Sequence, residues 1–391
     1  MMKPTRTILI SGAGIAGPAL AFWLHRFGFE ATIVEHAPAL RTGGHAVDFR
    51  GVSMDVLQRM GLLDEVRAVA THMGDMHYVD ESGRSVARLP ASFASGELEI
   101  LRGDLSRIFH AATADDVGYI FGDGIAALAE DADGVAVSFQ SGRTGHYDLV
   151  IGADGLHSAV RKLAFGPEQQ FLRHLGLYLA VATIPNFLDL DYDGRMFNAP
   201  GTIASIYSAR QNTEARAIFF FHAPALDYNH RDMAEQKAIV ASRYAGQGWV
   251  VPQLIEAMRQ ADDFYFYPVS QTCMDRWSRG RVALLGDAAF CATPLSGMGT
   301  GMAVTGAYML ARALRDAGGD YAAAFAHYEA GMRPFVVASQ KLAQMGTRGY
   351  VPQTRLGIKA SRFFTRLFNF LPPRVIVKPA TDAANSIVLA D

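Results

Sequence analysis

Cysteine is scarce in this chain, since only Cys273 and Cys291 occur among its 391 residues. Two cysteines cannot build a disulfide framework or a four-cysteine metal site, so a reduced, cytoplasmic setting is the default expectation. Long runs of one charge are also missing, and the net charge of −2 gives no reason to expect a nucleic-acid partner. No stretch reaches the roughly 18 apolar residues that a membrane-spanning helix needs, so we expect no membrane partner.

What the chain does have is ordinary globular composition, with 50% hydrophobic and 19% charged residues. Its length allows two or three domains with a sizeable core. The basic, then apolar start "MMKPTRTILISGAGIAGPALAFWL" also permits a signal peptide. The ordered glycines in that stretch favour the other interpretation, a buried strand followed by a tight turn and a core-facing helix.

The segment 5–37 predicts a strand, a glycine-rich turn, a helix and a second strand. Gly12, Gly14 and Gly17 form G-x-G-x-x-G, and the second strand, "EATIVE", ends at Glu35. Such glycines allow a pyrophosphate to approach a helix N-terminus, and the terminal acid can accept hydrogen bonds from ribose hydroxyls. A lone G-x-G-x-x-G is often only a helix-packing device, but these parts in order predict dinucleotide binding. The unit leaves NAD and FAD both open.

Two later stretches repeat the plan of a strand followed by an acid and a helix. They are "YDLVIGADGLHSAVRK" (147–162), with Asp154, and the segment 280–319, with Asp287, Pro294 and then Gly297, Gly299 and Gly301. Open α/β sheets bind ligands at the carboxyl ends of their strands. The almost bare backbone at the start of the last helix would suit a flat ring that develops negative charge. The alternative is a pair of ordinary strand–helix turns.

The three motifs in this order resemble the single-component flavoprotein aromatic hydroxylases, the para-hydroxybenzoate hydroxylase group. Together they span most of residues 7–315. Within that group the chain is most similar to the tetracycline-inactivating monooxygenases. The narrower resemblance is carried by "GGHAVDFRG", "LRGDL", "IPNFLDLD", "DDFYFYP" and the long C-terminal tail.

The resemblance implies FAD as the bound cofactor and NADPH as a transient reductant with no domain of its own, and it leaves the preference between NADPH and NADH open. It places Asp154 near the diphosphate, Asp287 on the ribityl chain, Arg102 against FAD and Arg41 against NADPH. It also makes Asp48 a FAD contact, with Arg50 facing the cofactor or the NADPH approach. The full set that it implies is Gly12, Gly14, Gly17, Glu35, His36, Arg41, Asp48, Arg50, Arg102, Asp154, Asp287, Pro294, Gly297 and Gly299.

The chain departs from the family pattern at three positions. The loop that commonly reads G-Q-G-x-N has Met298 and Gly301 instead of the two polar residues, and Phe290 replaces a histidine that often follows G-D-A-A. These changes keep the backbone role of the helix start but remove side-chain contacts near the flavin. They would either loosen the flavin or adapt it to another substrate.

The segment between the second and third motifs alternates β-branched and aromatic residues, which is typical of antiparallel strands. The fold class expected is therefore α/β, with a Rossmann-like FAD-binding domain, an inserted antiparallel β-sheet substrate domain and C-terminal helices. The FAD-binding domain would comprise 1–72, 98–170 and 272–350, the substrate domain 73–97 and 171–271, and the helical segment that bridges them 351–391. Candidate substrate contacts are Tyr207, Arg210, Arg216 and His222, although alternation prevents all of them from pointing inward.

The tail carries phenylalanines at 363, 364, 368 and 370 among basic residues, and Pro372-Pro373 would break it into two helices. A helix at a membrane interface is one interpretation. We expect instead that this aromatic stripe packs on its own domain. A second expected core helix covers residues 53–60 and ends at Gly61.

The resemblance implies a monomeric monooxygenase that uses NADPH and O₂ and hydroxylates a polycyclic phenol or enol through a flavin C4a-hydroperoxide. Tetracycline-type antibiotic inactivation, and hence antibiotic resistance, is the leading hypothesis. The chemistry resides in the flavin, so no catalytic side chain and no metal are expected. The alternatives are an aromatic hydroxylase with another biosynthetic or catabolic substrate, a flavin reductase, and a flavoprotein that sequesters a drug.

Overall fold

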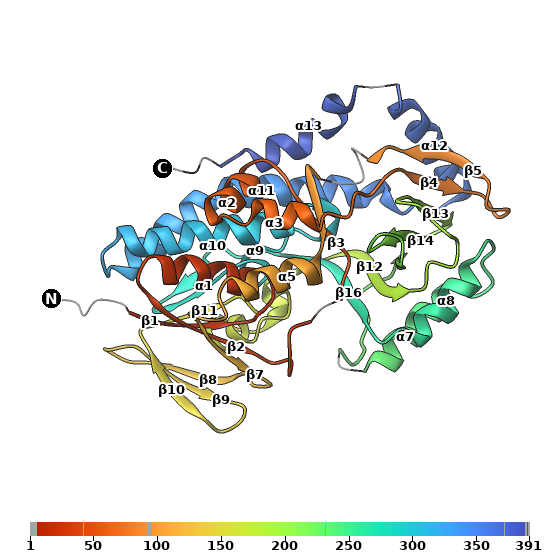
Figure 1. Ribbon diagram of the computed structural model, residues 1–391. Coiled ribbons are helices and arrows are strands. Elements are labelled where there is room, and N and C mark those ends of the chain that lie inside the picture. The colour runs from red at the N-terminus through yellow and green to blue at the C-terminus, as the bar shows by residue number, and fades with distance from the viewer. Residues whose placement is uncertain are drawn as a thin grey trace.

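The computed structural model describes residues 6–41, 43–91, 96–230, 232–370, 372–387 and 389, and all of their side chains except those at 348, 368, 373 and 376. A six-stranded sheet forms one half of the molecule, in the order β17-β18-β11-β1-β2-β7 (Figure 1). Its strands are β1 (Thr7–Ser11), β2 (Glu30–Glu35), β7 (Gly118–Phe121), β11 (Leu149–Gly152), β17 (Ser278–Arg279) and β18 (Val282–Leu284). All pair in parallel except β17 with β18. β2 and β7 lie on one side of β1, and the later strands β11 and β18 lie on its other side. Open sheets bind ligands at the point where the strand order changes direction in this way.

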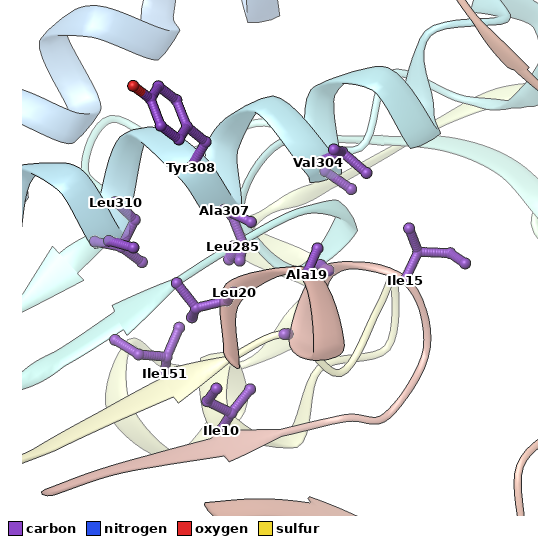
Figure 2. Close-up of a cluster of buried hydrophobic side chains, with 14 of the residues drawn as sticks. Ile10, Ile15, Ala19, Leu20, Ile151, Leu285, Val304, Ala307, Tyr308 and Leu310 are labelled. Carbon is purple, nitrogen blue, oxygen red and sulfur yellow. The ribbon is translucent and has the colours of Figure 1, made fainter. Parts of the chain in front are cut away.

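Helices cover this sheet because each presents an apolar stripe to it. They are α1 (Ala16–Arg26), α2 (Val52–Met60), α3 (Leu63–Ala68), α5 (Arg102–Ala111), α6 (Ala159–Ala164), α9 (Asp287–Phe290), α10 (Gly299–Asp316) and α11 (Tyr321–Tyr350). Figure 2 shows Leu20 of α1, Ile10 of β1 and Val304 of α10 in one buried cluster. Small residues on α1 and α10, such as Ala19 and Ala307, let the two helices approach closely above the strand ends.

A seven-stranded sheet forms the other half, in the order β16-β12-β15-β14-β13-β4-β5. Its strands are β4 (Met76–Val79), β5 (Ser85–Leu89), β12 (Leu172–Ile184), β13 (Gly194–Ala199), β14 (Thr202–Ala209), β15 (Glu214–His222) and β16 (Phe264–Thr272). The hairpin expected within 73–97 joins this sheet, since β4 pairs with β13, although residues 92–95 lie outside the described residues. The expected fold class is confirmed; the domain boundaries themselves stay a prediction.

The seven-stranded sheet has two apolar faces. One face packs against α7 (Met233–Arg243) and α8 (Val251–Gln260), through residues such as Phe219 and Phe266. The other face carries Leu179, Ile203 and Phe220 and packs toward the loop before α10, where Leu295 contacts it. Because successive side chains of a strand point to opposite faces, this second face holds alternate residues of each strand.

Several elements were not predicted from the sequence. A three-stranded antiparallel sheet, β10-β9-β8, packs beside the parallel sheet, and its strands are β8 (Ile125–Glu130), β9 (Val135–Phe139) and β10 (Thr144–Tyr147). A two-stranded pair, β3 (Ala46–Phe49) with β6 (Leu98–Leu101), also escaped prediction. The predicted helix over 53–60 is confirmed as α2, and its end at Gly61, with φ of 76°, is the left-handed cap that favours glycine.

The tail forms two helices, α12 (Arg355–Phe368) and α13 (Pro373–Ala384), which confirms the predicted break at the two prolines. α12 lies on β5 of the seven-stranded sheet, and α13 lies near α11 and α2 (Figure 1). The expected packing of the aromatic stripe is wrong. Phe363, Phe364 and Phe370 are 63%, 55% and 83% exposed, because α12 turns its polar side toward the protein. The side chain of Phe368 lies outside the described residues.

Candidate flavin site

The glycine turn after β1 leaves no room for side chains. Gly12 has a φ of +109°, and an ideal Cβ there would lie 2.5 Å from the carbonyl oxygen of Ala153. A Cβ on Gly17 would lie 1.9 Å from the carbonyl oxygen of Gly12. The turn is thus packed against the strand end that carries the second motif. This is the geometry that lets a pyrophosphate approach the backbone at the start of α1.

Glu35 at the end of β2 reaches back to this turn. Its carboxylate accepts hydrogen bonds from the backbone N–H groups of Ala13, at 2.9 Å, and Ala37, at 2.8 Å. Each carboxylate oxygen has further lone pairs, so it can still accept a hydroxyl. His36, which follows, is exposed.

Arg102 at the start of α5 lies over the glycine turn. An ideal Cβ on Gly14 would lie 3.2 Å from the Nη2 atom of Arg102, and the N–H of Arg102 donates to the carbonyl of His45 at 3.1 Å. Burial, and then the charge of Arg102, lower the pKa of His45 to about 4. His45 is therefore neutral at pH 7 and shares a 3.2 Å hydrogen bond with the hydroxyl of Tyr267. The positive charge of Arg102 thus lies beside the neutral pair formed by His45 and Tyr267.

Asp154 of the second motif adjoins the turn through its backbone, but its carboxylate is used locally. It accepts hydrogen bonds from the hydroxyl of Ser158 and from the N–H groups of Ala159, at 2.8 Å, and Val160, at 3.1 Å. Asp154 therefore caps α6. Burial raises the pKa of this carboxyl.

Arg161 of the same motif, which the sequence analysis missed, ties the second motif to the third. The side chain is fully buried, and it donates to the carbonyl of Ala288 at 3.0 Å and to that of Leu156 at 2.6 Å. It also pairs with Glu168 at 3.1 Å. The arginine at the end of "GADGLHSAVR" thus holds the start of the Asp287 segment in place.

Asp287 begins α9, directly after the positive-φ residue Gly286. Burial raises the pKa of this carboxyl, while a hydrogen bond from Cys291 and the charge of Arg102 act in the opposite direction. Burial also raises the pKa of the Cys291 thiol well above its ordinary value. Asp287 therefore lies close enough to Arg102 to feel its charge, its side chain is exposed, and Cys291 behaves as a neutral donor to it.

The loop between α9 and α10 is strained at its centre. Thr293, just before Pro294, has a φ of +84°, which a β-branched residue rarely adopts, and its buried hydroxyl oxygen has no partner among the described residues. Such strain and an unpaired polar atom are typical of a ligand site. Gly297 also has a positive φ, of 62°, and an ideal Cβ on Gly299 would meet nothing within 4 Å. The start of α10 therefore borders open space.

The three departures from the family pattern have physical reasons. Met298 is 2% exposed and belongs to the main core, and Phe290 packs on Trp277 with ring centroids 4.8 Å apart. An ideal Cβ on Gly301 would lie 3.1 Å from the hydroxyl oxygen of Ser53. A larger residue at 301 would collide with α2, so the glycine follows from the close approach of the two helices.

Asp48 lies in β3 and borders the flavin loop, and Arg50 follows directly after the end of that strand. An ideal Cβ on Gly297 would lie 3.4 Å from one carboxylate oxygen of Asp48, and the other oxygen accepts the N–H of Gly96 at 2.7 Å. Burial raises the pKa of Asp48, while the nearby Arg50 and the Gly96 N–H oppose this.

Glu99, a second half-buried carboxyl that sequence analysis missed, faces Asp48 across the β3–β6 pair. Burial, and then the charge of Asp48, raise the pKa of Glu99 to about 7, against hydrogen bonding by Thr71 and the charge of Arg50. A signal for this pair was absent, because about fifty residues separate its members and only the register of the strands brings them together.

Arg41 is exposed and lies near Tyr265 of β16; burial raises the pKa of that hydroxyl, and the charges of Arg102 and then Arg41 oppose the rise. The neighbouring Gly43 lies against Asp263, where an ideal Cβ would lie 2.2 Å from a carboxylate oxygen. Arg41 is thus placed where the loop after β2 meets the seven-stranded sheet.

The candidate substrate residues divide into two groups. Tyr207 and Arg216 face each other across β14 and β15; Tyr207 accepts the N–H of Ala46 at 3.0 Å, and Arg216 donates to the carbonyl of Gly44 at 3.1 Å. Arg210 lies nearby in the turn after β14 and pairs with Asp104 at 3.0 Å. His222 lies six residues further along β15 than Arg216, or about 20 Å, and bonds the carbonyl of Val351 at 3.0 Å. The structure does not bring His222 together with the others.

These features define a protein class: an α/β domain with a parallel sheet and a dinucleotide-binding glycine turn, beside a β-sheet with an apolar face. The comparisons identify the class more closely. A family model described as an FAD binding domain matches residues 5–337, and the chain belongs to that family.

Relatives and solved structures agree with this family. The chain is 40% identical over 344 residues to a flavin-dependent monooxygenase of Legionella longbeachae, covering 87% of this chain and 88% of that protein. It is 46% identical over 353 residues to an uncharacterized protein of Mycobacterium tuberculosis, covering 89% and 95% of the two chains. The crystal structure of the tetracycline destructase Tet(51) is similar over 100% of both chains, with 36% identity and a TM-score of 0.88. The chain is an oxidoreductase of the flavin-dependent monooxygenase class, and FAD is its cofactor.

Proposed function

We propose that this monooxygenase hydroxylates a polycyclic phenol or enol of the tetracycline type, with NADPH as reductant and O₂ as co-substrate. The observation that carries the proposal is the full-length similarity to a tetracycline destructase structure, at a TM-score of 0.88. An apolar sheet face opposite the start of α10, with Leu179, Ile203 and Phe220, supports it further. A flat, multi-ring substrate would bury its rings on such a surface.

The residues of the glycine turn fit FAD. The positions of Gly12 and Gly17 admit no Cβ, as close approach by a diphosphate requires. Glu35 would hold the adenosine ribose, Arg102 would neutralise the diphosphate above Gly14, and Asp287 would accept from the ribityl chain. When bound, the flavin supplies the transfer of electrons from the reductant and the activation of O₂.

The protein would contribute orientation, charge and the exclusion of water. The N–H groups of Gly299 and its neighbours at the start of α10 have no partner within the helix, since its first bond is from Met302 to Met298, at 2.9 Å. They would stabilise negative charge on a ring placed in the open space beside Gly299. Asp48, beside Gly297, would contact the flavin from the other side.

On the substrate side, Tyr207 and Arg216 would orient a polar edge of the substrate, and the aromatic strands would keep water out. Arg41 lies where the loop after β2 meets strand β16, and there it would contact the reductant. The carboxylate of Asp154 is bonded to the start of α6, so Asp154 would influence the diphosphate only indirectly, by holding α6 in place. His222 would act only on the packing of the loop after α11.

The test begins with the purified protein and its flavin spectrum. Consumption of NADPH is then followed with and without tetracycline, with NADH for comparison, and the product is weighed by mass spectrometry. Tetracycline-dependent consumption and a product heavier by one oxygen atom would support the proposal. Consumption that yields only H₂O₂ with tetracycline, while another phenol is hydroxylated, would assign the enzyme to a different substrate. A product heavier by two hydrogens would make it a reductase, and tight binding without turnover would make it a sequestering protein.

A further inference from the structure

The outer face of α12 is an apolar stripe that no described residue covers. Leu356, Phe363, Phe364, Leu367 and Phe370 are each at least 50% exposed. Their spacing of three, four and seven residues places the first four along one side of the helix, and Phe370 follows just past its end. Together they offer on the order of 500 Å² of apolar surface, which is near the upper end for the largest patch of a monomeric protein.

The opposite side of α12 is held to the sheet by polar contacts. Arg362 donates to the carbonyl of Val79 at 3.2 Å, Arg366 to that of Val86 at 2.7 Å, and Asn369 to that of Arg88 at 2.9 Å. Ile358 and Thr365 are buried on the same side. The orientation is therefore fixed, and the phenylalanines cannot turn inward without breaking bonds to the strands β4 and β5.

The charges beside the stripe distinguish between two possible partners of this face, a second copy of the chain and an anionic membrane. Residues 351–370 contain Arg355, Lys359, Arg362 and Arg366 and no acidic residue, although the whole chain carries a net charge of −2. Arg355 and Lys359 are exposed and lie on the flank of the apolar stripe. A second copy would bring Arg355 and Lys359 against the same two positive charges, whereas anionic lipid headgroups would neutralise them. Apolar residues flanked by basic ones are the pattern of a helix that lies in a membrane interface.

We infer that the outer face of α12 binds the surface of an anionic membrane, with its phenylalanines and leucines inserted between lipids and Arg355 and Lys359 at the headgroups. This attachment is peripheral. Among the described residues, no helix is long and apolar enough to cross a bilayer. The sequence predicts no membrane partner and packing of the stripe on its own domain, but the exposure of Phe363, Phe364 and Phe370 contradicts that packing.

The test is flotation of the full-length, flavin-loaded protein with vesicles of pure phosphatidylcholine and of equal parts phosphatidylcholine and phosphatidylglycerol. We expect binding to the anionic vesicles and at least about ten-fold weaker binding to the neutral ones, with binding falling from about 0.1 M to about 1 M salt. Equal binding to both vesicles, or to neither, would overturn the inference.

Two double variants separate the contribution of the apolar side chains from that of the basic side chains. Phe363→Ser with Leu367→Ser should weaken binding by about ten-fold or more. Arg355→Glu with Lys359→Glu should weaken it by at least about twenty-five-fold, since each basic residue near an anionic surface contributes about five-fold. The matched control, Leu163→Ser with Val337→Ser, removes exposed apolar side chains from α6 and α11 and should bind like the parent.

Flavin content and the thermal midpoint of each variant show that it is folded. Sedimentation equilibrium without vesicles tests the remaining alternative, in which a second copy of the chain binds the outer face of α12. If the parent is a dimer that Phe363→Ser with Leu367→Ser converts to a monomer, the face is a contact between copies and the membrane inference is wrong.

Discussion

Replacing Glu99 by Gln should remove a pH-dependent loss of stability. Glu99 faces Asp48 across the β3–β6 pair, and burial followed by the charge of Asp48 raises the pKa of Glu99 from 4.5 to about 7. The folded protein therefore binds a proton at this site that the unfolded chain has released above pH 4.5. By linkage, the free energy of unfolding falls as pH rises between about 4.5 and about 7, and the penalty is complete above pH 7.

The difference between the two pKa values is about 2.5, which corresponds to about 3 kcal/mol. A chain of 391 residues has an unfolding entropy of about 0.8 kcal/mol/K, so this amounts to about 4 °C in the thermal midpoint. Glutamine keeps the oxygen that accepts from Thr71 and carries no charge at any pH. Glu99→Gln should therefore match the parent at pH 5 and melt about 4 °C higher at pH 8.

Calorimetry of the flavin-free protein at the two pH values, at constant ionic strength, measures this effect. Titrating groups distant from Glu99 act equally on parent and variant, so the difference between their pH dependences reports on Glu99 and its partner Asp48. Glu65→Gln on α3, where the side chain is exposed, is the matched control and should leave the pH dependence unchanged. Parallel pH profiles for the parent and Glu99→Gln, or a variant that is less stable at pH 8, would refute the reasoning.

The other predictions concern the flavin site and the motif that supports it. Asp48→Ala should weaken FAD retention during gel filtration, because the carboxylate borders Gly297; unchanged flavin content and turnover would contradict its assignment to the cofactor. Gly301→Asn should cost about 1–3 kcal/mol in denaturant unfolding, because its Cβ would lie 3.1 Å from the Ser53 hydroxyl. Gly299→Ala, whose Cβ meets only open space, should keep the stability of the flavin-free protein but raise the Kd for FAD. Arg161→Met should cost about 3 kcal/mol or more, since it leaves buried carbonyls without a donor, and urea unfolding would show this.

The parts of the site that the sequence predicts are those built from neighbouring residues. The strand–turn–helix–strand order around Gly12 and Glu35 depends on positions within about thirty residues, and the structure shows the expected strand ends and tight turn. The Asp48–Glu99 pair depends instead on strand register over a separation of about fifty residues. Periodicity within one segment carries no information about such pairing. For the same reason, the bond from Arg161 to the carbonyl of Ala288 could not be predicted.

The substrate candidates show a second limit. Alternation along β14 and β15 predicts that Tyr207 and Arg216 share a face with other residues of their strands, and pairing across the strands brings these two together. It does not say which face meets the flavin, since both faces of the seven-stranded sheet are apolar. Only the positions of α7 and α8 on one side, and of Leu295 on the other, decide that.

The orientation of α12 shows why composition alone misleads in the tail. A helix with one apolar and one basic side is equally amphipathic in either orientation, and burial of the apolar side is the usual outcome. Here the helix lies against β4 and β5, where backbone carbonyls such as those of Val79 and Val86 accept from Arg362 and Arg366. Arginine satisfies these carbonyls and covers the strand with its methylene groups. The polar side therefore faces the protein, and the phenylalanines are left for a surface outside the chain.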